Sequence, residues 1–180
     1  MRLSFIVPAT CAVLTLGVQA FAAGSDSSTP PTTTDTSTKC EDGMVYDEKS
    51  KSCVKSSASI LNDDLRYAAV RELAYAGRYD SALMVIDSAE DQADPRFLNY
   101  RGYVARKQGD LDTAMSYYQR ALAADPDYVL ARSYMGQGLI EQGDLVAALG
   151  QLREIESRGG RDTWAFAALD QALRGQPTTY

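Results

Sequence analysis

The stretch that decides the fold is residues 95–128, PRFLNYRGYVARKQGDLDTAMSYYQRALAADPDY. It reads as two helices joined by a turn at Gln108-Gly109-Asp110. Gly102 and Ala114 lie 12 residues apart on either side of that turn, so small side chains can face each other and let two antiparallel helices approach closely. Larger residues at four-residue spacing, such as Tyr118 and Leu122, supply the apolar stripe of the second helix. The stretch therefore predicts a helix-turn-helix unit.

The same pattern recurs before and after this stretch. Gly77 lies 32 residues before Gly109, and Gly143 lies 34 residues after it. The facing small or apolar pair also recurs at 12-residue spacing, as Val70 with Ala82 and as Gly136 with Ala148. Self-similarity at a fixed period of this length is typical of solenoids, in which each unit buries its apolar face against the next.

A 34-residue period with this turn resembles the tetratricopeptide repeat. In residues 95–128 the family's large, small, small, aromatic, small and proline positions are occupied by Leu98, Gly102, Ala114, Tyr118, Ala121 and Pro126. The resemblance covers about 100 residues and implies an all-α helix-turn-helix solenoid of about three repeats, over 63–94, 95–128 and 129–162. The first repeat is two residues short in its tail, and the third lacks the final proline. The residues predicted to hold the repeats together are Gly77, Ala82, Gly102, Gly109, Ala114, Ala121, Pro126, Gly136, Gly143 and Ala148.

Capping signals bound this repeat domain, which we place at residues 60–175. Asn62, Asp63 and Asp64 suit the start of the first helix. Asp162 and Thr163 open a further segment, 163–174, that carries Trp164, Phe166, Leu169 and Leu173 on one side and stops at Gly175. We interpret this segment as a capping helix over the last repeat, because the final face of a solenoid must be covered. Residues 176–180 form a tail.

In the repeat family, the first helix of each unit lines a concave groove. Carrying those positions over gives the candidate groove residues Tyr67, Arg71, Tyr75, Asn99, Tyr103, Arg106, Lys107, Ser133, Tyr134, Gln137 and Glu141. Because Tyr67, Arg71 and Tyr75 follow i, i+4, i+8 spacing, they share one helix face. Arg and Tyr often anchor protein interfaces, and Arg pairs with carboxylates.

These residues predict a groove for a protein or peptide with acidic or carboxylate features. The alternative is that the Tyr side chains pack between repeats and the Arg side chains keep the helices soluble. Some family members clamp the C-terminal carboxylates of a chaperone with Lys and Asn. Tyr67 and Arg71 stand at those positions here, which argues against such a partner.

The N-terminus predicts export. Residues 1–22 contain Arg2, an apolar run from about Phe5 to Val18 and the small-x-small site Ala20-Phe21-Ala22, in the order of a cleavable signal peptide. The run is shorter than the roughly 20 apolar residues that span a bilayer, so we expect a periplasmic or secreted protein without a membrane span after cleavage. Cys11 would leave with the leader.

Between the leader and the repeats we expect a linker and a small loop closed by two cysteines. Residues 23–39 are dominated by Ser and Thr and have no large apolar residue, so we expect a disordered linker. Cys40 and Cys53 are the two remaining cysteines, and in an exported chain an even number favours a disulfide. The strand-like Met44-Val45-Tyr46 and the polar turn after it predict a stapled β-hairpin within 40–58. The spacing of this loop also resembles a fragment of secreted carbohydrate-binding modules of the peritrophin type.

Composition narrows the function. The 180-residue chain has no His and a formal net charge of −6, which excludes imidazole-based catalysis and disfavours nucleic acid as a partner. Phosphate-loop and nucleophile-elbow motifs are missing, and two cysteines without His make a poor metal site. We therefore expect no enzyme activity, cofactor or metal.

The resulting hypothesis is a bacterial TPR scaffold of the cell envelope, because the leader, linker, two-cysteine loop and short repeat array resemble small periplasmic repeat proteins. It would bind a protein or peptide in the concave groove. The alternative is an envelope glycan- or peptidoglycan-binding protein that uses the Cys40–Cys53 hairpin, with Tyr46 as a stacking ring.

Overall fold

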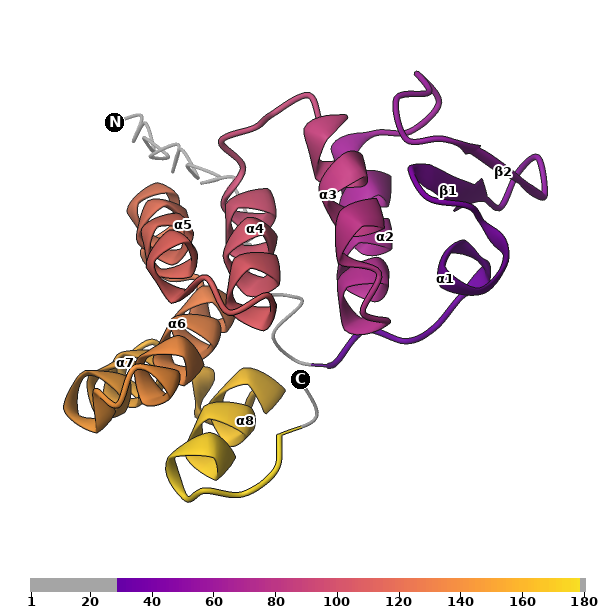
Figure 1. Cartoon of the computed structure of the whole chain (residues 1–180). Coiled ribbons are helices and arrows are strands. Elements are labelled where there is room, and N and C mark those ends of the chain that lie inside the picture. Colours follow the sequence, from indigo (N-terminus) through magenta and orange to yellow (C-terminus); the bar gives the residue numbers. More distant parts are fainter. Residues whose placement is uncertain (1–28, 179–180) are drawn as a thin grey trace, which may run out of the picture.

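The computed structural model describes residues 29–178, so the predicted leader lies outside the described residues. The described chain begins with a small module made of helix α1 (Asp35–Lys39) and strands β1 (Met44–Asp47) and β2 (Ser52–Lys55). Three helix pairs follow, α2 (Asp63–Tyr75) with α3 (Tyr79–Asp87), α4 (Pro95–Lys107) with α5 (Leu111–Ala124), and α6 (Val129–Glu141) with α7 (Leu145–Ser157). A short 3-10 helix (Gly160–Asp162) leads into α8 (Trp164–Leu173) (Figure 1). The predicted all-α repeat fold, preceded by a stapled hairpin, is confirmed.

Helices α4 and α5 meet at the small residues that the sequence pattern picked out, whereas Gly136 of α6 lies closest to Leu169 of α8. A Cβ atom on Gly102 would lie 2.6 Å from Cε1 of Tyr118 and 3.1 Å from the carbonyl oxygen of Ala114, so α4 and α5 can touch only because residue 102 has no side chain. Between the paired helices, Gly109 has a φ of +86°, a conformation that is strained for residues with a side chain. Asp110 then caps α5 by accepting a hydrogen bond from the Thr113 amide at 3.1 Å.

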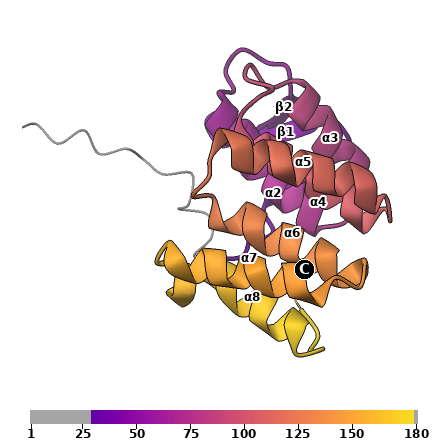
Figure 2. The same ribbon diagram turned by 90° about the vertical axis from the view of Figure 1, so that its left-hand side faces the viewer.

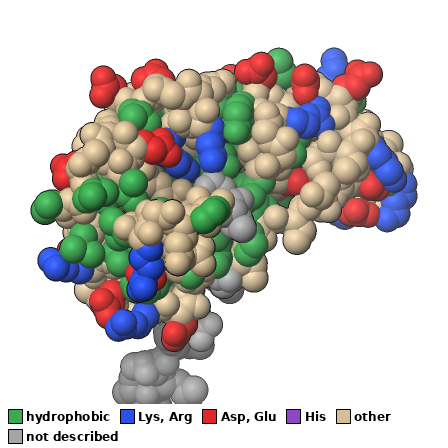
Figure 3. Space-filling view, turned by 60° about the horizontal axis from the view of Figure 1, so that its bottom comes forward, with side chains coloured by type: hydrophobic (Ala, Val, Ile, Leu, Met, Phe, Trp, Pro, Cys, Tyr) green, Lys and Arg blue, Asp and Glu red, His purple; other side chains and the backbone are tan. Residues whose placement is uncertain are grey.

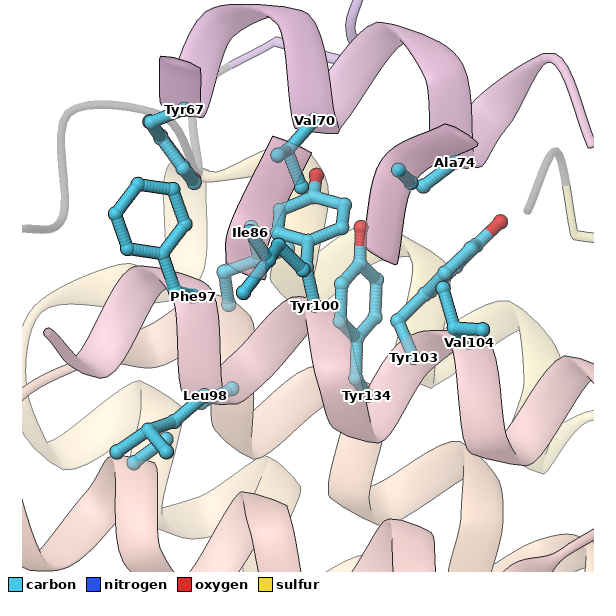
Figure 4. Packing of buried hydrophobic residues seen from close by; sticks show 14 of the residues in the cluster. Tyr67, Val70, Ala74, Ile86, Phe97, Leu98, Tyr100, Tyr103, Val104 and Tyr134 are labelled. Carbon is cyan, nitrogen blue, oxygen red and sulfur yellow. The ribbon is translucent and has the colours of Figure 1, made fainter. Parts of the chain in front are cut away.

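The core is rich in buried tyrosine. Tyr100, Tyr118, Tyr128 and Tyr134 are among the largest fully buried side chains. Figure 4 shows Tyr100 and Tyr134 pointing from α4 and α6 toward α2, beside Val70 and Ile86 of the first repeat. One continuous cluster of apolar contacts thus joins all three repeats.

The N-terminal module is a disulfide-linked hairpin that lies against the first repeat. Strands β1 and β2 pair antiparallel, with Val45 opposite Val54 and Tyr46 opposite Cys53. Cys40 and Cys53 are joined by a disulfide, as the cysteine count predicted. Val45 is buried and belongs to the same apolar cluster as the repeats. The hairpin is therefore packed onto the solenoid.

Two charged residues of the first repeat fasten this module. Glu72 of α2 is 6% exposed, and its carboxylate accepts hydrogen bonds from the backbone and hydroxyl groups of both Thr34 and Ser37. Arg78, between α2 and α3, donates to the carbonyl oxygen of Cys40 at 2.9 Å and to the Asp42 carboxylate at 2.6 Å. We call Glu72 and Arg78 the polar latch.

The structure corrects the expectation of disorder for the last part of residues 23–39. Asp35–Lys39 form α1, capped by Thr34, and Thr36 is buried. The physical reason is that the groups ordering this segment, on Glu72, lie 35 to 38 residues away in the chain. The Ser- and Thr-rich composition of the segment could not reveal them.

At the opposite end, α8 lies where the sequence predicts a capping helix. Leu169 is fully buried with Ile155 and packs close to Gly136, where a Cβ would lie 2.6 Å from the leucine Cδ2. Figure 2 shows the hairpin and α8 at opposite ends of the stack of helices. Within residues 29–178, none of the helices has the length and apolarity needed to cross a bilayer.

Candidate binding surface on the inner face of the repeats

The inner face is formed by the first helix of each pair and carries a row of aromatic side chains. The rings of Tyr75 on α2 and Tyr103 on α4 stack in parallel, with centroids 5.7 Å apart and planes 7° apart. Tyr103 contacts Tyr134 of α6 at 5.0 Å, and Trp164 of α8 meets Tyr75 edge-on at 6.2 Å. Aromatic pairs in these geometries stabilise a fold beyond their buried area. We call Tyr67, Tyr75, Tyr100, Tyr103, Tyr134 and Trp164 the aromatic row.

Hydrogen bonds between tyrosine hydroxyls connect α2 of the first repeat to α6 and to Tyr128, the N-cap of α6. The hydroxyl groups of Tyr75 and Tyr134 lie 3.0 Å apart, and those of Tyr67 and Tyr128 lie 3.1 Å apart. The partners are 59 and 61 residues apart in sequence. Two repeats that are not neighbours therefore touch across the inner face, which requires the array to be strongly curved.

Positive charges accompany the aromatic row. The guanidinium of Arg96 lies 4.9 Å from the ring centre of Tyr67, and the ammonium of Lys107 lies 5.6 Å from that of Tyr103. Arg71 is also near the Tyr67 ring, at 5.9 Å. Cations held over aromatic faces are stabilised by the ring quadrupole.

Burial shifts the ionisation of three groups in this region. Burial raises the pKa of Tyr134 well above that of an ordinary tyrosine, and interactions with Tyr100 and Tyr75 add to the shift. Burial also raises the pKa of Tyr118 to about 12. The pKa of Lys107 is lowered, first by burial and then by the neighbouring Arg106. Both tyrosines therefore stay protonated at neutral pH and can act as hydrogen-bond donors.

Most of the predicted groove residues prove to be buried. The buried members are Tyr67, Asn99, Tyr103, Arg106, Ser133, Tyr134 and Gln137. The members that reach the surface are Arg71, Tyr75, Lys107 and Glu141. The two interpretations of the sequence therefore apply to different residues, because most of the tyrosines pack between repeats whereas Arg71 and Lys107 remain at the edge. We call Arg71, Tyr75 and Lys107 the groove rim.

Several buried polar residues have structural partners. Ser133 donates to the Ala165 carbonyl oxygen at 2.7 Å, and Arg106 donates to Glu141 at 2.6 Å, so each links α6 to a neighbouring helix. The amide nitrogen and oxygen of Asn99 are buried without a hydrogen-bond partner among the described residues.

Sequence reasoning missed two contributors to this region. Tyr100 and Trp164 were not among the groove candidates, yet both belong to the aromatic row. Tyr100 lies one turn before Val104 on the buried side of α4, and Trp164 was noted only as a capping residue. Their positions follow from the curvature of the array, which brings α8 and α2 together.

An exposed apolar surface lies on α7. Leu145, Val146 and Leu149 are 55%, 84% and 39% exposed. Hydrophobic side chains gather at the left of Figure 3, on the side of the molecule that carries the last helices. This surface is separate from the groove rim.

The fold and its inner face define a helical-repeat solenoid protein. Residues 67–129 match a family model described as tetratricopeptide repeat, and residues 105–173 match a second model with the same description. The chain belongs to the tetratricopeptide repeat proteins. Comparison with curated proteins and with solved structures found no match.

Proposed function

We propose that this protein is a non-catalytic scaffold of the cell envelope that binds a protein or peptide partner along the inner face of its repeats. Tetratricopeptide repeats generally mediate protein–protein interaction. The observation that carries the proposal is the groove rim, where Arg71, Tyr75 and Lys107 reach the surface from a base of interlocked tyrosines.

A rigid base favours binding because little conformational freedom is lost when the partner arrives. The ring of Tyr75 is held by Tyr103 and by Trp164, and Lys107 lies over the Tyr103 ring. Ordering a mobile side chain at an interface costs about 0.5–1.5 kcal/mol, so preorganised side chains bind more strongly. The two rim cations favour a partner with carboxylates, since a charged acceptor makes the stronger hydrogen bond.

The disulfide and the sequence of residues 1–22 support the proposed compartment. The Cys40–Cys53 bond suits an oxidising, exported environment. Residues 1–22 have the order of a signal peptide, which supports a periplasmic or secreted location. The proposed role is cell-envelope assembly or maintenance.

The test is crosslinking in living cells followed by purification of the exported, tagged protein. The informative variant is Arg71→Ala with Lys107→Ala, which removes both rim cations. The matched control is Arg120→Ala with Arg153→Ala, two exposed arginines on α5 and α7. We expect a discrete partner that is retained by the wild type and the control and lost from the rim variant, while all three proteins melt alike. Equal retention by the rim variant would remove the inner face as the binding surface.

A further inference from the structure

A cavity of about 290 Å³ lies between the N-terminal module and α2. It is lined from the module side by Pro31, Thr32, Thr34, Thr36, Tyr46 and Glu48, and from α2 by Ala68, Ala69, Arg71 and Glu72. It is therefore a composite cavity that neither part forms alone. Ligand pockets usually have about 300–1,000 Å³, so this one is the size for a single ring and not for a longer ligand.

The walls of the composite cavity are held in place by hydrogen bonds between the module and α2 and within the module. The backbone amide of Tyr46 donates to Oγ1 of the buried Thr36 at 3.1 Å, which fixes β1 against α1. Thr34 donates its hydroxyl to Glu72 at 2.6 Å, which fixes α1 against α2. A preformed wall spares a ligand the cost of ordering it.

The chemistry of the lining combines an aromatic ring, one cation, two carboxylates and small apolar groups. Tyr46 is half-buried, and the ammonium of Lys39 lies 5.8 Å from its ring centre. Ala68 and Ala69 add methyl groups from α2, Arg71 adds a positive charge, and Glu48 adds a negative charge. The second carboxylate, on Glu72, already accepts hydrogen bonds from Thr34 and Ser37. An aromatic platform beside charged hydrogen-bonding groups suits a ligand with one apolar face and a polar edge.

We propose that this composite cavity binds one sugar ring that bears a carboxylate. The ring's C–H face would pack on Tyr46, its hydroxyls would donate to Glu48, and its carboxylate would pair with the Arg71 guanidinium. Arg71 already donates to the carbonyl oxygen of Thr29 at 3.0 Å. A carboxylate competes well for such a donor, because ionised acceptors form hydrogen bonds about twice as strong as neutral ones.

This site differs from glycan binding by the hairpin alone. Tyr46 lines a cavity whose other wall is α2, so the ligand requires the docked module and the first repeat together. The proposal is independent of protein binding on the inner face, although Arg71 borders both places. Tyr46 lies only at the composite cavity, so its variants separate the two functions.

The test is an NMR titration of the oxidised chain comprising residues 23–180, labelled with ¹⁵N. Methyl β-D-glucuronide and N-acetylmuramic acid are the acidic probes, and methyl β-D-glucoside and N-acetylglucosamine are the matched neutral sugars. We expect saturable shifts of the amides of Tyr46, Glu48 and Arg71 with at least one acidic probe. The response to the two acids distinguishes a uronic-acid source from a muramic-acid source.

Two variants and one control make the titration decisive. Tyr46→Ala should weaken binding about tenfold, the equivalent of about 1.4 kcal/mol, within the range expected for loss of an aromatic contact. Arg71→Gln should abolish the preference for acidic over neutral sugars. The matched control is Tyr117→Ala, a half-buried tyrosine of α5 that also has a cation near its ring, Arg120 at 5.1 Å, but does not line the composite cavity; it should bind like the wild type.

The proposal is overturned if the acidic probes cause no saturable shift, or if they shift amides elsewhere. It is also overturned if folded Tyr46→Ala protein binds as tightly as the wild type. Loss of sugar binding with an intact crosslinked partner in Tyr46→Ala would support the composite cavity and leave the inner-face function standing. Because Arg71 borders both places, loss of the partner from the Arg71→Ala, Lys107→Ala variant is assigned to the inner face only when Tyr46→Ala protein keeps that partner.

Discussion

The two ends of the solenoid are closed by different physical means. At the C-terminal end, the ten-residue helix α8 buries Leu169 fully and contacts α6 through Gly136 and Ser133. At the N-terminal end, the module has few large buried side chains and is held by the Cys40–Cys53 disulfide and by the charged groups of Glu72 and Arg78.

The difference shows that the apolar area available to a terminal cap decides which interactions hold it on the solenoid. A helix with one apolar face can cover a neighbour by burying area, at about 25 cal/mol per Å². A short loop with two four-residue strands has too little apolar area for this, so a crosslink and charge-assisted hydrogen bonds replace it. The C-terminal end should therefore be sensitive to loss of volume, and the N-terminal end to reduction and loss of charge.

The largest effect is expected at the C-terminal cap. Leu169→Ala should lower the free energy of unfolding by about 4 kcal/mol, because it leaves a cavity beside Gly136 that the rigid helices cannot fill. Urea denaturation followed by circular dichroism measures the change. Val146→Ala, at a position 84% exposed, is the control and should change stability by less than about 0.5 kcal/mol. A small effect of Leu169→Ala would mean that α8 is not held by apolar packing.

The next effect is expected from the crosslink. Cys40→Ser with Cys53→Ser should destabilise the module by about 3 kcal/mol, the chain-entropy value for a loop of about 15 residues. Hydrogen exchange should then show lost protection in β1 and β2 and little change in α6 and α8. A uniform loss of protection throughout the repeats would contradict the separation of the two ends.

A somewhat smaller effect is expected from the polar latch. Glu72→Ala removes the acceptor for the Thr34 and Ser37 hydrogen bonds and should cost about 2 kcal/mol, the range for hydrogen bonds to a charged group. The module should detach from α2 while its disulfide stays formed, which the exchange of the α1 amides reports. Glu41→Ala, at an exposed glutamate of the same module, is the control. Unchanged protection of α1 in Glu72→Ala would exclude the latch.

The buried tyrosines between the two ends are expected to give the smallest effect. Their ionisation lowers stability only in alkali, so it changes nothing near neutral pH. Burial raises the pKa of Tyr118 to about 12 and that of Tyr134 well above the ordinary value. Their contribution to stability is complete below pH about 10, the unfolded tyrosine value, and is lost as the pH rises toward the folded values.

Thermal unfolding measured from pH 8 to pH 12, with tyrosinate absorbance as a second signal, tests this dependence. The melting temperature should fall above pH about 10, and the buried tyrosines should ionise only as the repeats unfold. Because all the repeats share this core, both ends should lose protection together. A melting temperature that stays constant up to pH 12 would contradict the raised pKa values.

The repeat architecture could be predicted because its signals are local and periodic. Gly102 and Ala114 mark the contact between α4 and α5, and Gly109 marks the turn between them, whatever the rest of the chain does. The disulfide was predictable from the number of cysteines that remain after the predicted leader. The groove rim was predictable in part, since Arg71, Tyr75 and Lys107 were among the candidates and reach the surface.

The rest could not be predicted, because it depends on how far the array curves. The curvature of the array decides whether Tyr134 faces solvent or contacts Tyr75. This curvature is the sum of small rotations between successive repeats. The helix α1 was missed for a related reason, since its stabilising partner Glu72 looks in sequence like any polar residue on a helix surface.

By itself, then, the sequence determined the repeat type, the turns, the stapled hairpin and the chemical nature of the inner face, because each depends on spacing within about 35 residues. The tertiary structure alone decided which tyrosines are buried and which cations form the rim. It also decided that the hairpin shares a cavity with α2. These outcomes arise from contacts between distant segments, and a short-range pattern carries no information about them.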